Sequence, residues 1–175
     1  MSYDLETIQR NLNTALNKLL EFDSFLLKNS ANERSITHKL AEYLQSEFDD
    51  WNVDCEYNKI NENQNIEPKK IRLENEEVSI YDTDAKTVFP DIIVHQRHGK
   101  ENLLVIEAKK FRNNSNIDLD HLKLCKFTSK KHDFKYEYGF HITFFTGKTR
   151  YKEFPTMILY KDGKIIQKGG AVNEL

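Results

Sequence analysis

The 175-residue chain predicts an α/β fold, a three-layer sandwich in which a central mixed sheet is flanked by helices. Two observations lead to this prediction. The order of patterns along the chain is helix, helix, strand, hairpin, helix, strand, hairpin. A helix also precedes a further buried strand, which indicates a mixed sheet with helices on both faces. The length suits a single domain with its own hydrophobic core.

Two amphipathic helices are predicted at the start of the chain. Apolar residues recur at helical spacing from Leu5 to Phe22 or Phe25, and a break is expected near residues 23–24. A second helix is expected from about Asn32, a capping residue, with an apolar face that runs from Ile36 to Phe48. We expect the first helix to serve in packing.

The remaining elements follow from alternation, turns and composition. Residues 60–85 are polar, charged and aperiodic, which predicts an insertion or a long connection. The elements expected around them are a strand at 51–58, a hairpin of 87–95 and 102–110, a helix at 117–131, a strand at 138–146 and a terminal hairpin at 155–169 that turns at Asp162 and Gly163.

Charge and cysteine content limit the partners and the cellular compartment that we expect for this protein. The chain has 26 basic and 28 acidic side chains, so its net charge of -2 makes no global case for nucleic acid. Residues 109–135 nevertheless hold eight basic and three acidic side chains. Cys55 and Cys125 are too far apart for a zinc motif. No signal peptide or long apolar span is evident, so we expect a cytoplasmic protein that does not bind membranes.

The first predicted hairpin brings charged residues to one end. Alternation along residues 102–110 places Glu107 and Lys109 on the same face of an otherwise apolar strand. A reversal near Gly99 pairs positions whose numbers sum to about 198, so Asp91 is expected opposite Glu107. Desolvating two carboxylates and a lysine there requires a partner such as a cation. The alternative is an ordinary strand end, where Glu107 and Lys109 form an ion pair in solvent.

Glu33 is a further candidate at the start of the second helix. It precedes Ile36 by three residues and Leu40 by seven, which places its carboxylate at the head of the buried helix face. An acidic residue in a first helical turn is also favoured by the helix dipole alone, and that alternative stays open.

Together these residues resemble a known motif. Pro90-Asp91, followed by Glu107-Ala108-Lys109, resembles the PD-(D/E)xK nuclease superfamily, whose restriction-endonuclease-like core is helix, three strands, helix, strand. The segments "PDIIVH" and "NLLVIEAKK" are also similar to small bacterial members without an assigned substrate. The resemblance covers residues 30–146 of the single domain. It leaves a helical extension (1–29) and a C-terminal hairpin (147–175) outside the core.

The resemblance implies a metal-dependent nuclease that hydrolyses phosphodiester bonds. Its catalytic residues would be Asp91, Glu107, Lys109 and Glu33. Mg²⁺, for which Mn²⁺ can substitute, would be held by Asp91, Glu107, Glu33 and the Ala108 carbonyl, because Mg²⁺ prefers hard oxygen ligands. DNA is the expected substrate because most relatives act on DNA, and a homodimer stays open. The alternative is a catalytically inactive nucleic-acid-binding or regulatory protein on the same fold.

Nucleic-acid contacts are expected from basic residues near this site. At about 100° per residue, three lysines of the helix at 117–131 fall within a sector of roughly 60°, which suits a track of phosphates. A solvated helix face is the alternative. The residues expected to bind nucleic acid are these three lysines, Lys123, Lys126 and Lys130, together with Lys110, Arg34 and His38, of which His38 could instead pack at the helix edge.

Overall fold

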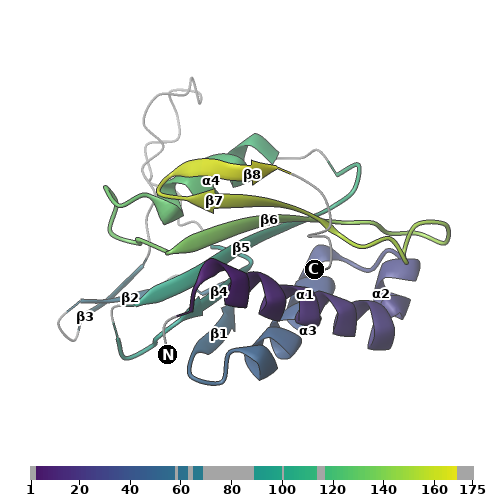
Figure 1. Ribbon diagram of the computed structural model, residues 1–175, viewed down its shortest axis with the longest axis horizontal. Helices are drawn as coiled ribbons and strands as arrows, with labels where there is room; N and C mark the ends of the chain where they lie inside the picture. Colours follow the sequence, from purple (N-terminus) through teal and green to yellow (C-terminus); the bar gives the residue numbers. More distant parts are fainter. Residues whose placement is uncertain are drawn as a thin grey trace.

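The computed structural model of the chain describes residues 3–57, 59–62, 65–68, 89–99, 101–113 and 117–168. These residues form an α/β fold (Figure 1). Its helices are α1 (Leu5–Phe22), α2 (Ser24–Lys28), α3 (Glu33–Glu47) and α4 (Ile117–Thr128). Its strands are β1 (Asn52–Cys55), β2 (Lys59–Glu62), β3 (Asn65–Pro68), β4 (Ile92–His95), β5 (Asn102–Lys110), β6 (Tyr138–Phe144), β7 (Thr156–Lys161) and β8 (Lys164–Lys168).

The main sheet is mixed, as the sequence predicts, and has six strands. Its order is β1-β4-β5-β6-β7-β8. Strands β5 and β6 are parallel, and every other neighbouring pair is antiparallel. Helix α4 lies between β5 and β6 in the chain and provides the crossover that a parallel pair needs.

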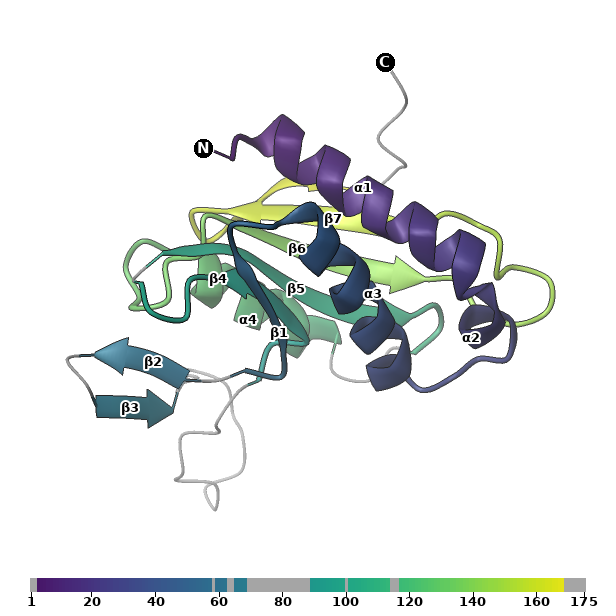
Figure 2. The ribbon, with the colours of Figure 1, turned by 90° about the horizontal axis from the view of Figure 1, so that it is seen from below.

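Helices cover both faces of this sheet. Helices α1 and α3 pack on one face and α4 packs on the other, as the turned view in Figure 2 also shows. On the first face, Leu12 and Leu40 share a core cluster with Ile106 of β5. On the other face, Phe127 of α4 packs with Val105. Because side chains alternate along β5, one strand contributes to both cores.

Side-chain caps set the starts of the two long helices. The carboxylate of Asp4 accepts a hydrogen bond of 2.9 Å from the Thr7 amide. The side-chain oxygen of Asn32 accepts one of 2.7 Å from the Ser35 amide, so the predicted cap is confirmed. The predicted break also occurs, because α1 ends at Phe22 and Asp23 separates it from α2.

Helix α1 packs in the same core as the central residues, and the C-terminal hairpin extends the same sheet. Ile8, Leu12 and Leu16 of α1 are fully buried in the cluster that also contains α3, so the expected packing role of α1 is confirmed. Strands β7 and β8 extend the main sheet beyond β6 and turn at Asp162 and Gly163, as predicted.

The structure differs from the sequence prediction in the connection before β4. The segment expected to be irregular begins with an antiparallel hairpin, β2 and β3, which forms a separate small sheet. Its strands were missed because their sequences, "KINE" and "NIEP", carry little apolar alternation. The rest of the predicted connection, from 69 to 85, lies outside the described residues. Helix α4 is also shorter than expected, since it ends at Thr128.

Candidate functional site

The β4–β5 hairpin has the register that the sequence predicts. Ile92 pairs with Ile106 and Ile93 with Val105. Asp91 immediately precedes β4, so it lies opposite Glu107 when the register is extended by one residue. The Ala108 amide donates a hydrogen bond of 2.7 Å to Oδ2 of Asp91. This bond fixes the Asp91 carboxylate at the end of the hairpin where the motif residues meet.

Glu107 is buried beneath α4. Only 2% of its surface is exposed. Its Oε2 accepts a hydrogen bond of 3.1 Å from the Lys123 ammonium, which also lies 3.4 Å from Oδ1 of Asp120. Its other oxygen, Oε1, has no hydrogen-bond partner among the described residues. One oxygen of a buried carboxylate is therefore left to accept a further ligand.

Lys109 lies between carboxylates from two different helices. Its ammonium is 3.2 Å from Oδ2 of Asp120, at the start of α4. It is also 3.9 Å from Oε2 of Glu33, the first residue of α3. The side chain is only 17% exposed, so the ion pair that the sequence allowed between Glu107 and Lys109 at a solvated strand end is replaced by contacts to Asp120 and Glu33.

Glu33 reaches the end of β5, as the sequence suggested, and is held there by two donors. Its Oε1 accepts hydrogen bonds of 3.0 Å from the Lys110 amide and 2.6 Å from the side-chain amide of Asn113. This carboxylate therefore joins the start of α3 to the segment that follows β5. Lys110 strengthens the same junction, because its ammonium lies 3.2 Å from the Ala31 carbonyl oxygen.

Asp120 and Lys123 complete a cluster that the sequence prediction did not assemble. Asp120 is 2% exposed and belongs to the buried face of α4 together with Leu124 and Phe127. The signal was present, because Asp120 precedes Leu124 by four residues and Phe127 by seven. We call Asp91, Glu107, Lys109, Asp120 and Lys123 the carboxylate–lysine cluster.

When every group is ionised, the cluster carries one negative charge in excess, because it combines three carboxylates with two ammonium groups. Burial raises the pKa of Asp91, although the Ala108 amide opposes this rise. Burial, and then repulsion from Asp91, raises the pKa of Glu107 well above its usual value. Lys123 remains charged: burial opposes its charge, but Glu107 and Asp120 outweigh burial and raise its pKa. The excess charge is balanced by either a proton or a bound cation.

The contribution of Glu107 to the stability of the metal-free protein is expected to fall as the pH rises from about 4.5, the ordinary pKa of glutamic acid. In that range the unfolded chain releases the Glu107 proton while the folded chain still holds it. At this carboxyl the folded state then binds more protons, so the share of the free energy of unfolding that Glu107 supplies falls with rising pH. Glu107→Gln should flatten this part of the profile in urea titrations at stepped pH with EDTA. Equal slopes for the two proteins would contradict the assignment.

A second buried polar group lies beside Glu107. His141 of β6 pairs in register with Glu107, is 1% exposed, and has no hydrogen-bond partner for either ring nitrogen among the described residues. Burial lowers its pKa to about 4, so its imidazole is neutral at pH 7. The His121 ring of α4 lies 4.9 Å from it, centroid to centroid. Neither histidine had been selected from the sequence.

The candidate site contains carboxylate oxygens, which are the type of donor atom that a hard cation prefers. The expected ligands Asp91, Glu107 and Glu33 offer carboxylate oxygens, and Oε1 of Glu107 is unpartnered among the described residues. In the part of the chain that the structure describes, no three His, Cys, Asp or Glu side chains are grouped to hold a metal ion. The Lys123 ammonium instead contacts Glu107 and Asp120 directly. A metal ion at Glu107 would therefore have to displace or share the place of Lys123.

The three lysines that were predicted to form a phosphate track on α4 do not share one exposed face. Lys123 points inward, with 14% of its side chain exposed, and contacts Glu107 and Asp120 instead of facing solvent. Lys126 is partly buried. Lys130 follows the helix, is 73% exposed, and lies 3.0 Å from Asp162. Lys123 departs from the expected role because α4 turns this side of its surface towards β5.

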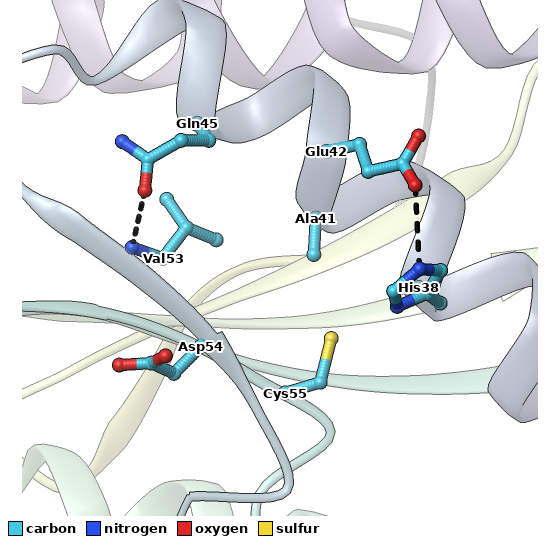
Figure 3. Close-up of a pocket in the computed structure, with 7 residues that line it drawn as sticks. All are labelled: His38, Ala41, Glu42, Gln45, Val53, Asp54 and Cys55. Atoms are coloured by element: carbon cyan, nitrogen blue, oxygen red, sulfur yellow. Dashed lines mark hydrogen bonds and ion pairs between the residues drawn. The ribbon is translucent and has the colours of Figure 1, made fainter.

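The other predicted nucleic-acid contacts lie on α3. Arg34 is exposed and pairs with Glu56 at 2.7 Å. His38 pairs with Glu42 one turn along the helix at 3.3 Å. His38 also lines a pocket of about 500 Å³ between α3 and β1 (Figure 3), which is formed by His38, Ala41, Glu42, Gln45, Val53, Asp54 and Cys55. This pocket does not contain the cluster residues.

The pocket offers little reactive chemistry. Burial raises the pKa of the Cys55 thiol to about 11, so the thiol is protonated at neutral pH. The side chain of Gln45 accepts a hydrogen bond of 3.0 Å from the Val53 amide and donates one of 2.9 Å to the Trp51 carbonyl oxygen. The first of these bonds satisfies a backbone amide of the edge strand β1 (Figure 3). The carboxylate–lysine cluster remains the stronger candidate site.

Comparison with known proteins gives no assignment. No family model matches the chain, and no curated protein is significantly similar to it. Among the described residues, no helix is long and apolar enough to cross a membrane.

Proposed function

We propose that the protein is a metal-dependent nuclease that hydrolyses phosphodiester bonds, with DNA as its substrate. The observation that carries this proposal is the meeting of Asp91, Glu107 and Lys109 at one end of a hairpin, in a cluster with excess negative charge. Such a cluster suits a site that binds a cation and then a phosphate.

The proposal includes a restriction-endonuclease-like fold. The sheet-forming core runs α3, β1, β4, β5, α4, β6, which is the order helix, three strands, helix, strand. The small β2–β3 hairpin is inserted between β1 and β4 without joining the main sheet. This order supports the resemblance that the motif residues suggested.

Mg²⁺, or Mn²⁺ in its place, is the proposed cofactor. Asp91 and Glu107 would hold it, with the Ala108 carbonyl and Glu33 as the further oxygen ligands expected from the motif. When bound, the ion supplies a nucleophilic water at neutral pH and offsets charge on the phosphate. The Ala108 amide prepares the site by holding Asp91 in place.

Lys109 is the proposed contact to the reacting phosphate. Its ammonium is held by Asp120 and Glu33 at the end of β5, so its position is defined before substrate arrives. From there it orients the attacking water and balances the charge that develops at phosphorus. Preorganised charge of this kind is a large contributor to catalysis, because no rearrangement is needed during the reaction.

Purified protein should cleave nucleic acid only with a divalent ion. We expect cleavage of plasmid or linear DNA with Mg²⁺ or Mn²⁺ and none with EDTA. Single-stranded DNA and RNA are tested in parallel, and Asp91→Asn is the inactive control. Cleavage by metal-free protein in EDTA, or full activity of Asp91→Asn, would contradict the proposal.

A catalytically inactive nucleic-acid-binding protein is the second candidate. It is favoured by one observation, the Lys123 ammonium that already contacts both Glu107 and Asp120. Binding of nucleic acid without cleavage under every metal condition would select this candidate over the nuclease.

A further inference from the structure

An aromatic and arginine surface lies just beyond the carboxylate–lysine cluster. The chain after β5 lies beside the end of β6, because the Phe111 amide donates a hydrogen bond of 2.8 Å to the Phe144 carbonyl oxygen. The rings of Phe111 and Phe145 are 5.2 Å apart between centroids. The guanidinium carbon of Arg150 lies 4.3 Å from the first centroid and 4.1 Å from the second. We call Phe111, Phe145 and Arg150 the ring–arginine platform.

The Phe111 side chain is exposed on a turn that hydrogen bonds hold in place. It is 42% exposed, whereas Phe145 beneath it is 9% exposed. The next residue, Arg112, has a φ of 70°, which is uncommon for a residue with a side chain. The turn is closed by a bond of 2.9 Å from the Asn113 amide to the Lys110 carbonyl oxygen, and the Asn113 side chain is held by Glu33. An exposed aromatic ring is therefore fixed two residues after Lys109.

The surroundings of the platform are basic. Residues 145–153 contain three basic side chains and one acidic side chain, Glu153. Glu153 binds the Arg150 guanidinium at 2.6 Å and so orients its plane. Nearby, the ammonium groups of Lys28 and Lys152 lie 5.7 and 5.8 Å from the centre of the Tyr151 ring. Several cations thus lie over aromatic rings at this end of the molecule.

This surface of cations and aromatic rings is suited to bind a polyanion that itself carries exposed flat rings. Cations attract phosphates, while a phenyl ring or a guanidinium plane stacks on a nucleobase. In a duplex the faces of the bases are covered by their neighbours, so only unpaired bases can use such a surface.

We propose that the ring–arginine platform binds unpaired bases of single-stranded nucleic acid beside the Lys109 end of β5. The assignment of this strand as a substrate rests on the proposed nuclease function. The binding itself is measured without cleavage.

The test measures fluorescence anisotropy of labelled oligothymidylate in EDTA, so that metal-dependent cleavage does not interfere. Phe111→Leu keeps an apolar side chain on Phe145 but removes the ring. It should weaken binding about 5- to 150-fold, the range for loss of one stacked base. Phe111→Tyr should restore it. Ile166→Ala, at a similarly exposed apolar residue of β8, is the matched control and should change affinity less than twofold.

Two further probes separate bases from phosphates. A duplex of the same length and an abasic oligonucleotide keep the phosphates but offer no free base face, so Phe111→Leu should change their affinity less than twofold. Equal losses for all three probes would overturn the proposal, as would unchanged oligothymidylate binding by Phe111→Leu or no binding by the wild type. Absence of cleavage with Mg²⁺, alongside ring-dependent binding, would reject the nuclease and leave the platform standing.

Discussion

Glu107→Gln is expected to lower the rate of phosphodiester cleavage by about 10²- to 10³-fold, while the protein remains folded. The size follows from the loss of a charged oxygen that holds the cation, since removing one group that stabilises developing charge costs about 10² to 10³ in rate. Single-turnover cleavage of labelled DNA in Mg²⁺ measures the effect.

The fold should survive this change because glutamine keeps the shape of Glu107 and removes the excess negative charge of the cluster. Glu101→Gln is the matched control, because the same replacement is made at an exposed residue at the other end of the hairpin. Its rate should match the wild type. If Glu107→Gln cleaved at the wild-type rate, Glu107 would have only a structural role.

The part of the site on the hairpin was predictable from the sequence because its geometry is local. Alternation along β5 and a short reversal fix the register, and a shift of one residue would bury the wrong face. The placement of Asp91 opposite Glu107 followed from these constraints alone. A helix cap and a helical period, which are also local signals, placed Glu33 at the head of the buried helix face, whereas its approach to the hairpin was expected from the resemblance.

The orientation of α4 that brings Lys123 to Glu107 could not be predicted, because it depends on tertiary packing. Gly139 of β6 has no side chain beneath this helix, and a Cβ there would lie 2.9 Å from the Thr128 side chain. The glycine therefore allows close approach of α4 to the sheet, and the resulting orientation turns Asp120 and Lys123 towards Glu107. By helical period alone, Lys123 belonged equally well to an exposed stripe with Lys130.

Lys123→Met provides the strongest test of this packed arrangement, because methionine keeps the apolar stem and removes only the cation. Glu107 and Asp120 are each 2% exposed, so the variant leaves buried carboxylates facing one fewer positive charge. Breaking a buried pair in this way costs about 3–5 kcal/mol, which is roughly 10 °C in melting temperature for a chain of this size. Thermal denaturation in EDTA measures the loss. Lys130→Met is the matched control, since its pair with Asp162 is exposed and should contribute under about 1 kcal/mol.

Mg²⁺ adds a second measurement to the same pair of variants. Without the Lys123 ammonium, a divalent ion meets less repulsion near Glu107 and compensates a larger excess of negative charge. The ion binds the folded state, so it should raise the melting temperature of Lys123→Met more than that of the wild type. If Lys123 instead contacts phosphates, Lys123→Met should lose little stability in EDTA, and its melting temperature should respond to Mg²⁺ as that of the wild type does. That result would return Lys123 to the nucleic-acid surface, whereas a large loss that Mg²⁺ restores would identify its ammonium as the group that balances the cluster in the absence of metal.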